Sequence, residues 1–197
     1  MNEVPPTPAI SDALGKRYAL PGIRHLAGPV PICGRAVTVR VKGPDWGIVV
    51  EAIDEAEEGD VLVIETRDRY RAYWGGLSSL SAKRKGLAGT VVDGMVRDLD
   101  DIRELGYTVF GRGVVPRAGT HRSSGEINVR VYISGIEVNP GDVIIGDESG
   151  AVVVPEEKWD DVLNAAREIL ELEDAIRTDI ASGLPWRKIL SKRLGEG

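Results

Sequence analysis

The pattern of apolar and polar positions predicts alternating strands and helices in the first half of the chain. Strands are expected at 34–41, 61–65, 89–94 and 108–113, with helices between them at about 46–56, 77–85 and 98–105. The first strand alternates, whereas VLVIE (61–65) is a continuous apolar run, which is typical of a strand buried on both faces. This order of short crossovers predicts a parallel sheet covered by helices.

The second half has a different pattern. Between 127 and 155, short apolar segments are separated by Gly and Pro turns, which favours antiparallel or mixed strands. A short helix is expected near 8–17. A long helix should run from about 156 to 180, followed by a break at 183–185 and a short helical tail. We therefore expect one α/β domain over residues 1–197.

Composition and charge narrow the possible partners and locations. Net charge is -6, with 42% hydrophobic and 28% charged residues, so no overall field attracts nucleic acid or an anionic membrane. The apolar runs are too short to span a bilayer, and the first residues lack a signal-peptide pattern. The single cysteine, Cys33, cannot form an internal disulfide, which fits a cytoplasmic protein.

Several kinds of active site can be excluded. Two histidines and one cysteine cannot build a Cys/His zinc site. The chain has neither a phosphate-binding G-x-x-x-x-G-K-[ST] loop nor a G-x-S-x-G nucleophile turn. A catalytic site would therefore use carboxylates, arginines and backbone amides, which suit a hard, oxygen-ligated cation and an anionic substrate.

The segment VVDGMVRD (91–98) is the first candidate for such a site. It delivers Arg97 and Asp98 just after a buried strand, where ligands collect in open α/β sheets. Arginine matches a carboxylate with a planar fork, and aspartate offers oxygens to Mg²⁺ or Mn²⁺. The alternative is that Asp98 caps the following helix, with Asp101 at its N3 position.

Two further features could carry function. Gly75 and Gly76 open a helix, where free amides bind anions, although taken alone they are better explained by an ordinary turn between a strand and a helix. Glu173 lies in the middle of an apolar stripe on the C-terminal helix. A carboxylate in that position must pair with an arginine, lie at a subunit interface or serve a site.

These segments also carry a family resemblance. GLAGTVVDGMVRDLDDIRELGYTVFGRGVVP (86–116) resembles the signature of the RraA and class II 4-hydroxy-4-methyl-2-oxoglutarate aldolase family. Further matches, in the family's order and covering nearly the whole chain, are SDAL (11–14), GRAVTV (34–39), GDVLVIE (59–65), V-x-PGDVIIGDESGAVVVP (138–155) and REILELEDAIR (167–177). Such sequences are also labelled demethylmenaquinone methyltransferase-like, but this chain has no glycine loop for S-adenosylmethionine.

The resemblance implies a fold, an assembly and an activity. The fold would be a swivelling α/β/β domain with a mixed sheet and a long C-terminal helix. The assembly would be a trimer or a dimer of trimers, with the C-terminal helices (about 156–194) at the subunit interface. The activity would be that of a metal-dependent carbon–carbon lyase, forming pyruvate from a small 2-oxo acid by aldol cleavage or oxaloacetate decarboxylation. The alternative is a non-catalytic regulator of the RraA type, which binds and inhibits the endoribonuclease RNase E.

The resemblance also implies site roles. Arg97 would hold the carboxylate and oxo group of pyruvate, and Asp98 would anchor Mg²⁺ or Mn²⁺. The amides of Leu77 and Ser78, after Gly75 and Gly76, would bind the substrate carboxylate, and the neighbouring subunit would contribute Glu173 and Asp12 as acids. The chain departs from the family at Gly76, where the aldolases usually carry Asp or Glu. That departure favours decarboxylation, which needs fewer proton-transfer groups.

Overall fold

The computed structural model describes residues 4–195 and contains one large sheet, two small ones and six α-helices within that range. The strands are β1 (Arg24–Ala27), β2 (Ile32–Val41), β3 (Val61–Glu65), β4 (Ala72–Trp74), β5 (Gly89–Val92), β6 (Met95–Val96), β7 (Val109–Gly111), β8 (Gly113–Val114), β9 (Gly125–Ile127), β10 (Val131–Ile133), β11 (Ile136–Val138), β12 (Val143–Asp147) and β13 (Gly150–Val154). The helices are α1 (Thr7–Ala13), α2 (Gly47–Glu55), α3 (Gly76–Lys85), α4 (Leu99–Leu105), α5 (Trp159–Ala181) and α6 (Trp186–Leu194), with a 3₁₀ turn at Glu156–Lys158.

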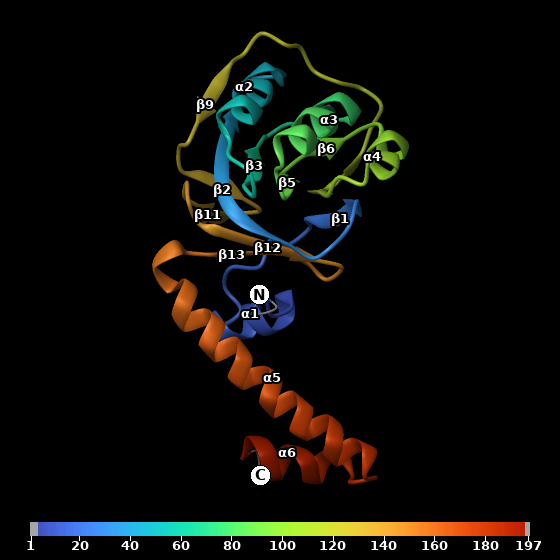
Figure 1. Ribbon diagram of the computed structural model, residues 1–197, viewed down its shortest axis with the longest axis vertical. Coiled ribbons are helices and arrows are strands. Elements are labelled where there is room, and N and C mark those ends of the chain that lie inside the picture. The colour runs from blue at the N-terminus through green and yellow to red at the C-terminus, as the bar shows by residue number, and fades with distance from the viewer. Residues whose placement is uncertain (1–3, 196–197) are drawn as a thin grey trace.

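The large sheet has the predicted parallel centre. Its order is β1-β7-β5-β3-β2-β12-β13, with β9 paired to β2. Strands β2, β3, β5 and β7 are parallel, and β1, β9, β12 and β13 add antiparallel pairs. The long, curved β2 joins the parallel part of the sheet to β12 and β13 (Figure 1). The expectation of a mixed α/β fold with a long C-terminal helix is therefore confirmed.

Apolar side chains are buried on both faces of this sheet. All five residues of β3 are buried, as expected of a strand covered on both sides. One core lies between the sheet and α2, α3 and α4. A second lies on the other face, beneath the β10–β11 hairpin. A third joins α1 and the first part of α5 to β12 and β13.

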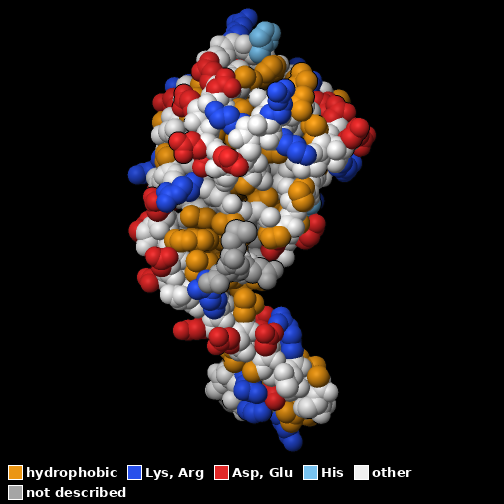
Figure 2. Space-filling model, in the orientation of Figure 1, with side chains coloured by type: hydrophobic (Ala, Val, Ile, Leu, Met, Phe, Trp, Pro, Cys, Tyr) orange, Lys and Arg blue, Asp and Glu red, His pale blue; other side chains and the backbone are white. Residues whose placement is uncertain are grey.

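The C-terminal helices project from this body. The beginning of α5 packs through Val162 and Ala166, which are buried. Its last turns leave the body, and α6 folds back along them (Figures 1 and 2). The hairpin is held by the buried Ile189 and by Asp179, which pairs with Lys192 and Arg193. The apolar stripe predicted on α5 is therefore buried only near the start of the helix. Its last residue, Ile180, is 47% exposed.

Two elements differ most clearly from the prediction. The first helix ends at Ala13 and does not reach residue 17, because Gly15 and Lys16 adopt positive φ angles. The strand predicted over 108–113 is divided into β7 and β8, which belong to different sheets. Within residues 4–195, no helix combines the length and apolar character needed to cross a membrane.

Candidate functional site

A small parallel sheet brings the two glycine- and arginine-containing motifs together. Strands β4, β6 and β8 follow β3, β5 and β7 in the chain and pair in the order β4-β6-β8. The backbone N–H of Arg97 donates to the carbonyl of Trp74 at 3.0 Å. This backbone hydrogen bond holds Gly75, which follows Trp74, close to Asp98, which follows Arg97. From the sequence, Arg97 and Asp98 were expected just after a buried strand and Gly75 and Gly76 at the start of a helix, but this second sheet was not predicted.

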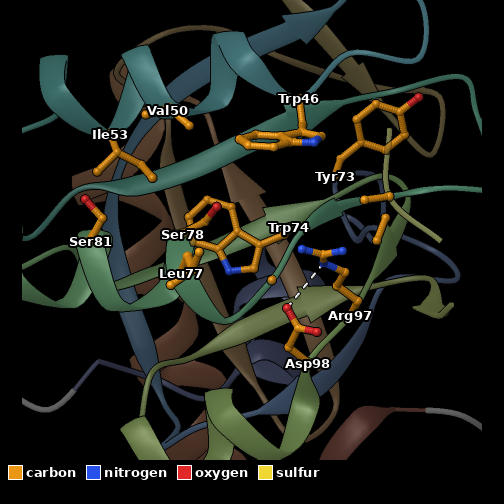
Figure 3. Close-up of a pocket in the computed structure, with 13 residues that line it drawn as sticks. Trp46, Val50, Ile53, Tyr73, Trp74, Leu77, Ser78, Ser81, Arg97 and Asp98 are labelled. Atoms are coloured by element: carbon orange, nitrogen blue, oxygen red, sulfur yellow. Dashed lines mark ion pairs between the residues drawn. The ribbon is translucent and has the colours of Figure 1, made fainter. Parts of the chain in front are cut away.

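A cavity of about 260 Å³ lies beside these motifs (Figure 3). Its lining comes from α2 and the residue before it, from β4, from the start of α3, from the residues after β6, and from the loop after β8. These residues are Trp46, Val50, Ile53, Ala72, Tyr73, Trp74, Gly75, Leu77, Ser78, Ser81, Arg97, Asp98 and Ala118. Five of the site residues predicted from the sequence are among them.

Arg97 and Asp98 form an ion pair at one end of the cavity. The Nε of Arg97 lies 3.2 Å from Oδ2 of Asp98, and the two side chains are 40% and 37% exposed. The same Oδ2 accepts the backbone N–H of Gly76 at 3.2 Å. The remaining guanidinium nitrogens of Arg97 have no protein partner within residues 4–195 and are directed into the cavity (Figure 3).

The conformation of Asp98 does not fit the alternative in which its side chain caps α4. Asp98 precedes α4 with φ 58° and ψ 41°, in the left-handed region, and its side chain makes no capping hydrogen bond. Aspartate tolerates this conformation better than most residues, but it still carries strain. The interpretation of Asp98 as a side-chain N-cap was therefore wrong, because its carboxylate turns toward Gly76 and Arg97.

The start of α3 forms the neighbouring wall. The amides of Leu77 and Ser78 lie in the first turn, where an α-helix leaves its N–H groups without intrahelical partners. Both residues line the cavity. A Cβ atom on Gly75 would lie 2.7 Å from Oδ2 of Asp98. Gly75 is therefore needed for α3 and the Arg97–Asp98 pair to approach this closely.

Gly76 lies between two carboxylates. A Cβ atom at this position would be 3.0 Å from Oδ2 of Asp101 and 3.5 Å from Cβ of Asp98. Asp101, considered from the sequence only as an N3 residue, is thus a neighbour of the site. The signal that could have identified it is its spacing of three residues from Asp98, which places both on one side of the first turn of α4.

The opposite wall is aromatic and aliphatic, and the sequence analysis did not predict it. Trp46, Val50 and Ile53 face the cavity from α2 and the residue before it, and Tyr73 contributes from β4 (Figure 3). Burial raises the pKa of the Tyr73 hydroxyl above its usual value. These residues come from segments with no recognisable motif, so only the folded chain brings them together.

Two predicted residues lie elsewhere in the chain. Asp12 is on α1, where it lies 3.8 Å from Lys16, and Glu173 is on α5, paired with Arg177 at 2.9 Å. Neither lines the cavity, and Figure 1 shows α1 and α5 on the far side of β12 and β13 from α2 and α3. Within one protomer, the structure therefore does not bring Asp12 or Glu173 to Arg97.

The side-chain oxygens at this site suit a metal ion that is held by a single carboxylate. Within residues 4–195, no three Asp, Glu, His or Cys side chains form a group that could hold a metal ion. Oδ1 of Asp98 accepts no hydrogen bond from that part of the chain. One such carboxylate suits Mg²⁺ or Mn²⁺, since Mg²⁺ retains several waters and uses one or two carboxylates plus substrate oxygens. Asp98 is the residue that would hold it.

Comparison with known proteins identifies the family of this chain. The family model described as RraA-like, Aldolase/RraA, matches residues 7–153. The chain belongs to this family. The matched residues include Asp12, Gly75, Arg97 and Asp98 but end within β13, so Glu173 and the C-terminal helices lie beyond them.

Individual relatives carry different names. A protein of Thermus thermophilus named 4-hydroxy-4-methyl-2-oxoglutarate aldolase is 32% identical over 152 residues, which cover 76% of this chain and 92% of that protein. A crystal structure of an uncharacterized protein from Pseudomonas syringae superposes with a TM-score of 0.87 at 31% identity, covering 95% of this chain and 90% of the other. RraAS2 of Streptomyces coelicolor, described as an unusual member of the RNase ES inhibitor RraA protein family, gives a TM-score of 0.77 at 28% identity, covering 86% and 90%.

Proposed function

We propose that this protein is a divalent-metal-dependent lyase that releases pyruvate from a 2-oxo acid. The observation that carries the proposal is the Arg97–Asp98 pair at the end of a cavity, next to the free amides at the start of α3. An arginine and helix amides recognise a carboxylate, and an adjacent aspartate with an unpartnered oxygen is a ligand for a hard cation. The aldolase name of the Thermus thermophilus relative supports the same reaction class.

Each residue has a distinct task in this reaction. The amides of Leu77 and Ser78 bind the substrate carboxylate, and Arg97 donates to the 2-oxo oxygen. When the bond to C3 breaks, the electron pair is delocalised onto that oxygen, where the Arg97 guanidinium stabilises the charge. A divalent cation held by Asp98 would supply further polarisation of the oxo group. Oxaloacetate decarboxylation is the favoured reaction of the two, because Gly76 provides no acid for aldol proton transfer.

A pyruvate-release assay tests the proposal. Oxaloacetate and 4-hydroxy-4-methyl-2-oxoglutarate are each supplied with Mg²⁺, and pyruvate is measured through lactate dehydrogenase, against an enzyme-free control. We expect release that EDTA abolishes without lowering the helical circular dichroism. Arg97→Ala should lose activity, whereas Arg84→Ala, an exposed arginine on α3 outside the cavity, should retain it. Equal activity in the two variants would refute the assignment.

We further propose that the site is completed by a neighbouring subunit in a trimer or a dimer of trimers. Glu173 and Asp12 lie away from Arg97 in their own chain, and the end of α5 projects from the body. Arg97→Ala and Glu173→Ala should each be nearly inactive as homo-oligomers. Co-expressed mixed oligomers should regain a fraction of the activity, because some interfaces then join an intact Arg97 to an intact Glu173. Verified mixed oligomers without any recovery would contradict a shared site.

A second candidate function is binding of RNase E, as in proteins of the RraA type. The structural similarity to RraAS2 supports it. The distinguishing experiment measures RNase E cleavage of an RNA substrate with increasing amounts of this protein. Inhibition that survives in Arg97→Ala, without pyruvate release by the native protein, would establish the regulator and exclude the lyase.

A further inference from the structure

Three connections join the large sheet to the small sheet beside the cavity. Strands β3, β5 and β7 lie side by side in the large sheet, and β4, β6 and β8 continue them in the same order in the small sheet. The connections are residues 66–71, residues 93–94 and the single residue Arg112. Arg69 and Asp93 lie in the first two of them. Each connection therefore carries a charged side chain at the carboxyl end of the large sheet.

The carboxylate of Asp93 binds groups from both of the other connections. Its Oδ1 lies 3.1 Å from a terminal guanidinium nitrogen of Arg69 and also accepts a hydrogen bond from Nε of Arg112. Its Oδ2 accepts the backbone N–H of Ser134, in the turn of the β10–β11 hairpin, at 3.1 Å. The Asp93 side chain is only 7% exposed. Because these partners all belong to its own chain, the contacts do not depend on what a neighbouring subunit adds to the cavity.

The strands of the small sheet are too short to fix their own alignment. Strands β6 and β8 have two residues each, β4 has three, and the β4–β6 register is irregular between Ala72 and Trp74. Pairs of this length specify a register only weakly. The register matters because β4 leads to the amides of Leu77 and Ser78, whereas β6 leads to Arg97 (Figure 3). A shift of one residue would move Arg97 by about 3.3 Å relative to those amides.

Two kinds of interaction hold the small sheet in place. Trp74 and Val96 pack in the hydrophobic core, but hydrophobic contact is non-directional and does not by itself align the strands. The bonds of Asp93 are directional, and they act just before the strands begin. Arg69 precedes the start of β4 by three residues, and Arg112 directly precedes β8. One carboxylate therefore holds the starts of all three strands together.

We propose that Asp93 is a positioning residue for Arg97, a role that rests on the lyase activity proposed above. By holding the start of β6 against the starts of β4 and β8, Asp93 sets the separation between the Arg97 guanidinium and the amides at the start of α3. A substrate whose carboxylate is bound by those amides then has its 2-oxo oxygen beside Arg97. Neither Asp93 nor its two arginines line the cavity, so Asp93 acts through the backbone of β6. A displacement of about 1 Å can lower a rate about 100-fold.

Hydrogen exchange followed by mass spectrometry measures this alignment without any substrate. Asp93→Asn keeps the size of the side chain but removes the charge that pairs with both arginines. The N–H of Arg97 forms the β4–β6 bond to Trp74, and it should then exchange at least about tenfold faster, the factor expected when a hydrogen bond to a charged group is lost. Amides of β3 and β5 should keep their wild-type rates. Unchanged exchange at Arg97, or equal acceleration in both sheets, would overturn the proposal.

Steady-state kinetics tests whether the alignment matters for the reaction. With oxaloacetate and Mg²⁺, kcat for pyruvate release should fall about 10- to 100-fold in Asp93→Asn. KM should change much less, because the amides that bind the carboxylate belong to α3 and remain in place, while Arg97 stabilises charge that develops only as the bond breaks.

A second buried aspartate provides the matched control. Asp142 and Asp93 are both 5% exposed. The carboxylate of Asp142 accepts backbone N–H groups from Asn139 and Glu156, and none of these three residues lines the cavity. Asp142→Asn should therefore retain both the kcat and the exchange rate at Arg97. Equal loss of kcat in Asp142→Asn and Asp93→Asn would refute a positioning role.

A milder pair of variants covers the case in which Asp93→Asn does not fold. Arg69→Gln removes only the link between the starts of β4 and β6, at a residue that is 39% exposed. It should lower kcat and accelerate exchange at Arg97, by smaller factors than Asp93→Asn. Arg67→Gln changes an exposed arginine of the same connection and should leave both quantities unchanged. Equal behaviour of these two variants would overturn the proposal.

The two measurements also separate this proposal from the lyase proposal. Faster exchange at Arg97 in Asp93→Asn, without pyruvate release by the native protein, would refute the lyase and retain Asp93 as the residue that aligns β6. Pyruvate release by the native protein, with an unchanged kcat in Asp93→Asn, would retain the lyase and refute the positioning role. No release by the native protein together with unchanged exchange would refute both.

Discussion

Replacing Asp98 separates its structural role from its chemical one. Its side chain accepts one backbone hydrogen bond, from Gly76, and forms an ion pair with Arg97, while its backbone is left-handed at φ 58°. The substitution Asp98→Asn should preserve two of these features, since an amide oxygen can still accept the Gly76 N–H and asparagine tolerates the left-handed region. Alanine would lose all three. Glycine would relieve the backbone strain but lose both side-chain interactions.

The magnitudes follow from these contacts. The backbone hydrogen bond contributes about 0.5–1.5 kcal/mol, and the half-exposed ion pair about 0.2–1 kcal/mol. A left-handed conformation costs an ordinary side chain about 1–2 kcal/mol. Asp98→Ala should therefore lower the free energy of unfolding by about 2–4 kcal/mol, which is about 4–16 °C in Tm for a protein of this size. Asp98→Asn should cost less than about 1 kcal/mol, and Asp98→Gly should fall between the two.

Activity should follow a different order from stability. All three variants lack the carboxylate that would hold the cation, so each should lose Mg²⁺-dependent pyruvate release, including the stable Asp98→Asn. Thermal denaturation followed by circular dichroism gives the stabilities, and the coupled assay gives the activities. Substantial activity in Asp98→Asn would refute the role of Asp98 as the metal ligand. A Tm for Asp98→Ala equal to that of Asp98→Asn would refute the argument from backbone strain.

Three further predictions concern other positions. Arg97→Lys should retain less than about 1% of the wild-type kcat/KM, because a point charge cannot replace a planar two-point donor. Near-normal rates would contradict a bidentate role of Arg97. Gly76→Asp should raise aldol cleavage of 4-hydroxy-4-methyl-2-oxoglutarate relative to oxaloacetate decarboxylation, and Asp101 must shift to admit the new side chain. Gly76→Ala is the control, and an unchanged ratio of the two activities would show that Gly76 does not set the choice of reaction. Hydrogen bonds from Arg193 and Lys192 hold the pKa of Asp179 below its usual value, so its stabilisation of the α5–α6 hairpin is present above about pH 4 and is lost as the pH falls through the lowered value. The difference in Tm between wild type and Asp179→Asn should accordingly shrink below about pH 4, and a difference independent of pH would contradict this ion pair.

The sequence alone determined the parallel strands of the large sheet and the helices between them. The run 61–65 is apolar at all but its last position, so it is expected to be a strand covered on both faces. Gly86 ends α3 because it adopts the left-handed conformation that glycine permits. The Arg97–Asp98 and Gly75–Gly76 motifs were likewise visible in the printed sequence. These features depend on neighbours within a few residues, which a single sequence contains.

Only the tertiary structure decided how the site is assembled. The pairing of β4 with β6 joins Trp74 to Arg97, and the Trp46 side chain is positioned by a hydrogen bond to the carbonyl of Gly119. Such contacts link residues 23 and 73 positions apart in the printed sequence, and no local pattern specifies them. The same holds for Asp98, whose cap-like position suggested a bond to its own helix until the fold brought Gly76 within reach. The aromatic and aliphatic wall of the cavity follows from packing between segments that carry no motif of their own.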